Sequence, residues 1–141
     1  MDDIEVSFPG GLRVDARIGE HVVRTDQPTA SGGEASAPAP FDLFLASVAT
    51  CAGIYALGYC RARSLSIDGL KLVQHVEVDE ATKLPARIEL RLSLPKGFPA
   101  HHRVAILRAV SGCKVKKTIA LAPIFDVALA EAEEAQPCAA E

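Results

Sequence analysis

The feature that most constrains the fold is an uncharged run of 18 residues, from Leu43 to Cys60. This length reaches the lower limit for a helix that crosses a membrane. The run is only mildly apolar, because it contains Gly, Ala, Ser and Thr, and Asp42 and Arg61 bound it. We therefore expect a helix over 40–63 that is buried in a protein core rather than in a membrane. One domain of 141 residues has too few other residues to bury such a helix on most sides, so a second copy of the chain is expected to pack against it.

Short strands are expected before this helix. Apolar and polar side chains alternate in residues 4–8 and 13–18, and a Pro-Gly-Gly turn signal separates the two stretches. A third such stretch lies at 21–25, so residues 1–25 predict an antiparallel β-meander. Residues 26–39 are rich in Pro, Gly, Ser and Ala and predict a loop. A connection of this length is often functional or covers an interface.

The second half of the chain predicts a hairpin, a helix and a last strand. Residues 69–95 contain two apolar stretches around a turn, and the second alternates strictly, which is typical of a half-exposed antiparallel strand. Residues 100–112 have the apolar period of a second helix, and a short segment then leads to a C-terminal strand over 123–130. The expected apolar face of that helix contains Val104, Ile106, Leu107 and Val110. With no internal boundary, residues 1–141 predict a single α+β domain.

Charge and targeting signals narrow the classes of function. The chain has 18 acidic and 15 basic residues, for a net charge of −3, so nucleic-acid binding is not expected. Residues 1–5 are acidic, unlike the basic start of a signal peptide, and we expect a cytoplasmic protein. No two of the four cysteines have the C-x-x-C spacing, and no histidine is spaced from them as a metal ligand. No metal and no cofactor are therefore expected.

Two of the four cysteines lie where thiol chemistry could occur. Cys51 lies inside the uncharged run among small residues, which leave room for a ligand or for another helix. Cys113 follows the second helix beside three lysines, whose charge favours a thiolate. Cys60 is nine residues after Cys51 and lies on the opposite helix face, and Cys138 lies in an acidic, Ala-rich tail that we expect to fray. Either candidate thiol could instead be a small buried side chain with no chemical role.

A peroxidase built on two thiols needs a thiolate, a cation to stabilise it and a second thiol that resolves the sulfenic acid. Because Cys51 lies inside a helix, it has no free helix N-terminus nearby and needs an arginine. The N-terminal meander offers Arg13, Arg17 and Arg24. Each of the three could also be an ordinary exposed strand charge.

The residues around both cysteines resemble motifs of the OsmC/Ohr family. Residues 32–34, Gly-Gly-Glu, and residues 40–51, PFDLFLASVATC, are similar to the glycine-containing loop and the Pro-x-Glu-Leu-Leu helix start that precede the first cysteine of that family's site. Residues 113–119, CKVKKTI, are similar to its second motif, Cys-x-Val-x-x-Thr-Leu. The hairpin and the second helix agree in order and length, so the resemblance covers roughly residues 12–130.

The resemblance implies both a fold and an activity. The implied fold is α+β, with two chains intertwined as a homodimer and two long central helices wrapped by antiparallel β-sheets. Members of the family reduce organic hydroperoxides through a disulfide, which a dithiol reductant then reduces. The resemblance therefore implies Cys51 as the peroxidatic thiol and Cys113 as the resolving thiol, at a site in the dimer interface.

The helix start departs from the pattern of the family's peroxidases. Those proteins typically carry a glutamate directly after the proline, and that glutamate helps to hold the catalytic arginine. Here Phe41 takes that place, and Asp42 matches a glutamate of a more divergent OsmC-like branch. We expect Arg17 or Arg24 to face the first cysteine and Glu34 to orient that arginine.

Two other functions remain open on the sequence. The missing glutamate favours a non-catalytic dimer that binds a small apolar ligand in the same cleft. The two thiols are also compatible with a redox sensor, in which a disulfide changes the contact with a partner.

Overall fold

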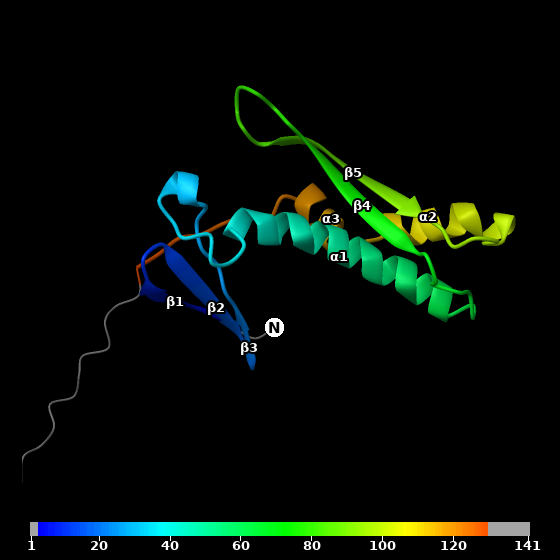
Figure 1. The fold of residues 1–141 in the computed structure, drawn as a ribbon, viewed down its shortest axis with the longest axis horizontal. Helices are drawn as coiled ribbons and strands as arrows, with labels where there is room; N and C mark the ends of the chain where they lie inside the picture. Colours follow the sequence, from blue (N-terminus) through cyan, green and yellow to red (C-terminus); the bar gives the residue numbers. More distant parts are fainter. Residues whose placement is uncertain (1–2, 130–141) are drawn as a thin grey trace, which may run out of the picture.

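A computed structural model describes residues 3–129 of the chain, arranged around one long helix, α1 (Pro40–Arg61) (Figure 1). Pro40 occupies the first turn, where a missing N–H costs nothing, and the Ala39 N–H donates a hydrogen bond to the Asp42 carboxylate at 3.2 Å. Only 28 % of the apolar window of α1 is buried within the chain. By length and composition this helix could cross a membrane, although core helices of soluble proteins meet the same criterion. Within one chain, most residues of the central helix therefore stay at least partly exposed.

Three antiparallel strands lie near the N-terminal end of α1, where the sequence predicts the meander (Figure 1). They are β1 (Ile4–Gly10), β2 (Arg13–Ile18) and β3 (His21–Val23), in the order β1-β2-β3. Gly10 and Gly11 make the first turn with φ values of 121° and 61°, which favour glycine. All side chains of β1 are exposed, so neither face of this strand is covered within one chain.

The loop between β3 and α1 is organised by one buried carboxylate, that of Asp26. It accepts hydrogen bonds from the N–H groups of Gln27, Glu34 and Ser36, at 2.8, 3.2 and 3.0 Å, and from the Ser36 hydroxyl at 2.7 Å. Gly33 passes so close to Gln27 that a Cβ would lie 2.0 Å from its carbonyl oxygen. A short 3-10 turn, η1 (Thr29–Ser31), completes the loop. The predicted loop is therefore a defined structure that leads the chain into α1.

The β-hairpin is formed by β4 (Lys71–Val78) and β5 (Pro85–Ser93). Its inward face pairs Leu72 with Leu92 and Val76 with Ile88. The Gln74 side chain, between these pairs, donates a hydrogen bond from Nε2 to the carbonyl of Leu45 at 3.1 Å. This bond joins the hairpin directly to α1, along which the hairpin lies (Figure 1).

A second helix, α2 (Arg103–Ser111), follows a 3-10 turn, η2 (Ala100–His102), and packs on the C-terminal half of α1. The core lies between these helices under the hairpin and contains Ala52, Ala56, Tyr59, Cys60, Phe98, Ile106 and Val110. Only half of the expected apolar face of α2 is buried. Ile106 and Val110 pack against α1, whereas Val104 and Leu107 are 61 % and 54 % exposed, because a helix that packs on a single neighbour buries only one narrow stripe of its side chains.

The chain after α2 differs from the expectation in two respects. Residues predicted as a short connection form a third helix, α3 (Lys114–Ala120). Residues 123–129, predicted as most of a strand, pair with no strand within the described chain, and their large apolar side chains are almost fully exposed. A strand requires a hydrogen-bonding neighbour, which a single chain does not provide here. Residue 130 and the acidic tail with Cys138 lie outside the described residues.

Candidate functional site

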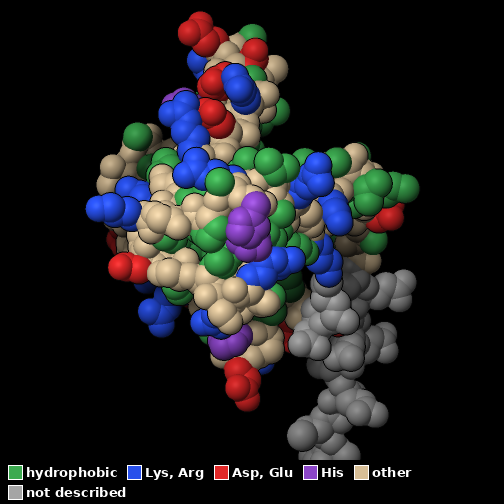
Figure 2. All heavy atoms as spheres, turned by 90° about the vertical axis from the view of Figure 1, so that its right-hand side faces the viewer, with side chains coloured by type: hydrophobic (Ala, Val, Ile, Leu, Met, Phe, Trp, Pro, Cys, Tyr) green, Lys and Arg blue, Asp and Glu red, His purple; other side chains and the backbone are tan. Residues whose placement is uncertain are grey.

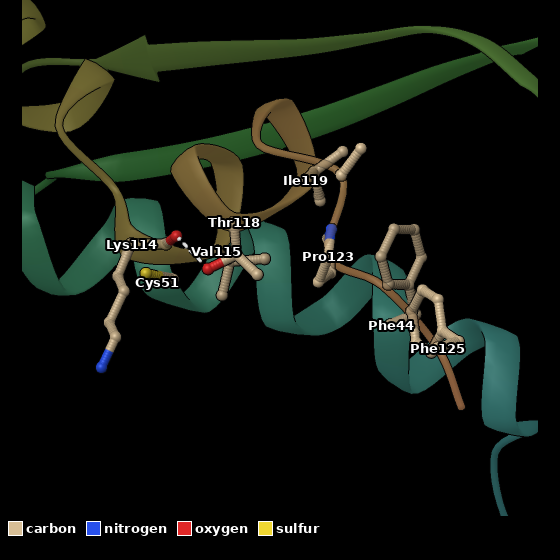
Figure 3. Close-up of a pocket in the computed structure, with 9 residues that line it drawn as sticks. Phe44, Cys51, Lys114, Val115, Thr118, Ile119, Pro123 and Phe125 are labelled. Atoms are coloured by element: carbon tan, nitrogen blue, oxygen red, sulfur yellow. Dashed lines mark hydrogen bonds between the residues drawn. The ribbon is translucent and has the colours of Figure 1, made fainter. Parts of the chain in front are cut away.

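The fold brings the two predicted thiols together. Cys51 lies in the middle of α1 and is partly exposed, whereas Cys113 is completely buried and occupies the N-cap position just before α3. Gly112 ends α2 and allows the turn, since a Cβ there would lie 3.2 Å from the Ala109 carbonyl oxygen. α3 then lies across α1 so that its first turn covers Cys51 (Figure 3).

Both cysteines are free thiols, and the side chain of Cys113 is close enough to Cys51 to affect its ionisation. It is the largest of the influences that lower the pKa of Cys51. The backbone N–H groups of Val115 and Lys114 and the positive charge of Lys116 lower that pKa further. Burial acts in the opposite direction but is outweighed. The arrangement therefore favours a thiolate at Cys51.

Beside the thiol pair lies an open cavity of about 620 Å³. Its lining is almost wholly apolar and comes from α1, α3 and the segment after α3, including Phe44, Val115, Ile119, Pro123 and Phe125. The Cys51 sulfur lies at one end of it, and the rings of Phe44 and Phe125 lie together further along α1 (Figure 3). Lys114 is the one charged side chain among the lining residues. Such a site suits an apolar molecule that brings a reactive group to Cys51.

The arginines and the glutamate predicted for the site lie elsewhere within one chain. Arg17 forms an ion pair with Glu5 across β1 and β2, and both side chains are exposed. Arg24 and Glu34 are exposed, and neither lines the cavity. Arg13 donates to the Gly10 carbonyl at 3.2 Å. The cations that the described chain places around Cys51 are instead lysines of α3, so an arginine that faces Cys51 stays a prediction.

The remaining described cysteine has a different environment. Cys60 is fully buried in the core between α1 and α2, and burial raises its pKa. It lines no part of the cavity beside Cys51. Residues 3–129 contain no group of three or more His, Cys, Asp or Glu side chains that could hold a metal ion.

Two structural features were missed in the sequence: the start of α3 beside Cys51, and the buried Asp26 in the loop before α1. The N–H groups at the start of α3 were missed because the segment is only seven residues long and three of them, Val115, Thr118 and Ile119, are β-branched, which lowers helix propensity. Asp26 was missed because a single aspartate in a polar loop resembles a solvated charge. The Gly33 beside it, in a loop that returns toward Gln27, was the available signal.

A family model described as OsmC-like protein matches residues 32–128. The chain belongs to the OsmC-like family. The match includes both cysteines, α1, the hairpin and α3, and the predicted α+β class of this family is confirmed.

Solved structures with the same fold support this OsmC-like assignment. One, described as a candidate osmotic stress induced and detoxification response protein from Psychrobacter arcticus 273-4, has a TM-score of 0.71 at 19 % identity and covers 84 % of this chain and 88 % of that chain. Another, described as an organic hydroperoxide resistance protein OsmC from Legionella pneumophila, has a TM-score of 0.52 at 19 % identity and covers 84 % and 90 %. At this identity the likeness concerns the fold alone. Comparison with curated protein sequences finds no match.

Proposed function

We propose that this OsmC-like protein is a cysteine peroxidase that reduces organic hydroperoxides. The observation that carries the proposal is that Cys51, with the Cys113 side chain beside it, lines one end of an apolar cavity. One structural neighbour is described as an organic hydroperoxide resistance protein, which agrees with this chemistry. The different exposure of the two thiols supports the proposed roles, in which the accessible Cys51 meets the peroxide and the buried Cys113 resolves the product.

The first step is an attack of the Cys51 thiolate on the terminal oxygen of the hydroperoxide. A sulfur–oxygen bond forms, the oxygen–oxygen bond breaks, and the alkoxide leaves and takes a proton to become an alcohol. Cys51 becomes a sulfenic acid, so the sulfur is oxidised while the peroxide is reduced by two electrons. The apolar cavity would hold the organic part of the substrate, since its walls offer few polar partners.

The second step joins the two cysteines. The Cys113 sulfur attacks the sulfenic sulfur of Cys51, and a disulfide forms as water leaves. An external dithiol, the reductant that we propose as partner, then restores both thiols by two exchange reactions. Because Cys113 is buried, the dithiol is expected to attack the disulfide at Cys51.

The protein is further proposed to work as a cytoplasmic homodimer. Large apolar side chains stay exposed on several elements, among them Phe8 on β1, Ile54 on α1 and Leu107 on α2. Hydrophobic side chains also reach the surface between Lys and Arg at the end of the molecule that carries α2 (Figure 2). Exposed apolar surface of this extent marks interaction sites. A second copy would cover α1 and supply a neighbour for residues 123–129.

The test is thiol titration of the full chain before and after one equivalent of cumene hydroperoxide, followed by peptide mapping by mass spectrometry. We expect a fast loss of two thiols and a peptide in which Cys51 is linked to Cys113. The variant Cys51→Ser is expected to abolish turnover of the hydroperoxide. The matched control is Cys60→Ser, which alters a thiol on the same helix that lines no part of the cavity.

Two results would contradict the proposal. Unchanged turnover in Cys51→Ser excludes Cys51 as the attacking group. Slow oxidation that is scattered over Cys60 and Cys138 excludes a dedicated thiol pair. In either case the cavity of about 620 Å³ favours the second candidate function, binding of a small apolar ligand, and Cys51→Ser should then keep its affinity for that ligand.

A further inference from the structure

A second cavity lies on the other side of α3 from the first. It has a volume of about 320 Å³ and is open to solvent between α1, β5 and α3. Its apolar lining comes from Val48 on α1, Ile88 and Leu90 on β5, and Ala120 on α3, and the charged side chains of Arg87 and Lys116 also line it. The proposed reaction gives this space no role, because Cys51 lines the first cavity and neither thiol lines the second.

The two cavities lie over the same face of α1. Phe44 and Cys51 line the first cavity, and Val48 lines the second. Residues four and three positions apart on an α-helix share one face, so these three side chains form a continuous stripe. An extended apolar chain that follows this stripe would pass from one cavity toward the other.

The side chain of Ile119, near the end of α3, lines both the first cavity and the second. In Figure 3 it lies on the side of the first cavity that faces the hairpin. It is 45 % exposed, so it separates the two spaces without being held in the core. Neighbouring residues of α3 serve one side only: Thr118 lines the first cavity and Ala120 the second.

We propose that the second cavity extends the substrate site, and that Ile119 divides the two cavities and sets the length of the apolar chain that the site accepts. The role of Ile119 in selecting substrates rests on the proposed function, because it places the reacting end of the chain at Cys51. Its role in selecting bound ligands does not depend on that function, since an unreactive chain of the same length would occupy the same space.

Two substitutions should change chain-length preference in opposite directions. Ile119→Ala removes the dividing side chain and opens the second cavity to a long chain. Ala120→Phe fills the second cavity from its own wall and leaves the lining of the first intact. Each methylene group that is buried or excluded changes affinity roughly three- to fourfold, so about two methylene groups change it roughly tenfold.

The test compares a short and a long probe with each variant of the full-length protein. Turnover is measured with butyl and dodecyl hydroperoxide, and binding is measured with butanol and dodecanol by displacement of anilinonaphthalene sulfonate. Ile119→Ala is expected to raise the ratio of long- to short-chain kcat/KM and affinity roughly tenfold, and Ala120→Phe to lower it. The matched control is Ile67→Ala, the same truncation at a residue that is also 45 % exposed and lines neither cavity.

Each outcome supports or overturns the proposed role of Ile119. If either variant leaves the ratio of long- to short-chain kcat/KM and affinity within about twofold of the Ile67→Ala control, Ile119 does not set chain length and the inference is wrong. If Ala120→Phe does not fold, Ala86→Leu on β5 fills the same cavity and replaces it. If dodecanol binding responds as expected while no hydroperoxide is turned over, the extended site stands and the peroxidase proposal fails.

Discussion

The side chain of Cys113 lies beside the sulfur of Cys51, although Cys113 is the residue just before α3 and Cys51 lies in the middle of α1. Gly112 ends α2, and α3 then packs on α1 and brings Cys113 to Cys51. This arrangement gives the accessible thiol a neighbour that can lower its pKa in the reduced state and bond to it in the oxidised state.

The Cys113→Ala substitution is expected to raise the pKa of Cys51, because it removes the largest of the influences that lower it. The thiolate fraction at neutral pH falls, and the rise of alkylation rate with pH moves to higher pH. The measurement is the rate of iodoacetamide modification of Cys51 against pH, followed by peptide mass spectrometry. Cys113→Ser is the matched control, since its hydroxyl can still donate to the Cys51 sulfur. An identical profile in the wild-type and Cys113→Ala proteins would show that this contact does not control the thiolate.

The Asp26→Asn substitution is expected to destabilise the fold in a pH-dependent way. Hydrogen bonds from Ser36, Gln27 and Glu34 hold the pKa of the Asp26 carboxyl below its ordinary value of 3.8. The carboxylate therefore contributes its stabilisation fully above that value, and the contribution is lost as the pH falls toward the folded-state pKa. We expect a melting temperature lower by several degrees at neutral pH and a smaller difference from wild type below about pH 4.

Ser36→Ala provides the comparison for Asp26, since it removes only the hydroxyl donor and keeps the N–H donor. Its loss of stability should be the smaller of the two. A difference between Asp26→Asn and wild type that stays constant from neutral to acidic pH would contradict the role given to the carboxylate.

The Ile106→Ala substitution tests which face of α2 is buried. Ile106 has no exposed surface, so the loss of three carbons should cost about 2–5 kcal/mol in the free energy of unfolding. Val104→Ala, on the exposed side of the same helix, should cost no more than about 0.5 kcal/mol in the isolated chain. Urea unfolding monitored by circular dichroism measures both values. Equal losses would place Val104 in a buried contact.

The Ile54→Glu substitution tests the proposed homodimer. Ile54 lies in the middle of α1 and is 58 % exposed within one chain, so a charge there costs little unless a second chain covers it. We expect the variant to shift the protein from dimer to monomer, as measured by analytical ultracentrifugation over a range of concentrations. Ile67→Glu, at an exposed loop position, is expected to stay dimeric. A dimeric Ile54→Glu protein would exclude this face of α1 from the interface.

Local patterns in the sequence anticipate much of this fold. The uncharged run from Leu43 to Cys60 predicted α1, and strict alternation over residues 87–94 predicted β5. The motifs at residues 40–51 and 113–119 indicated the family, and their cysteines proved to be neighbours. These features are encoded by residues close together in the chain.

Features that depend on distant contacts were not predicted. α3 is a seven-residue helix with three β-branched residues, and packing on α1 stabilises it. Asp26 became important only through N–H groups that the folded loop turns toward it. The apolar spacing of α2 could not show that Val104 and Leu107 point away from the single helix on which α2 packs. A strand over 123–129 needs a neighbour whose identity the local pattern does not contain.

The burial of Cys113 gives the proposed reaction cycle a single entrance. Every external molecule must approach the thiol pair from the side of Cys51, so an oxidant and a reductant compete for the same place and cannot be bound together. The protein would then bind the oxidant and the reductant alternately, and each would have to dissociate before the other binds. An inert molecule that occupies this entrance would stop oxidation and regeneration alike.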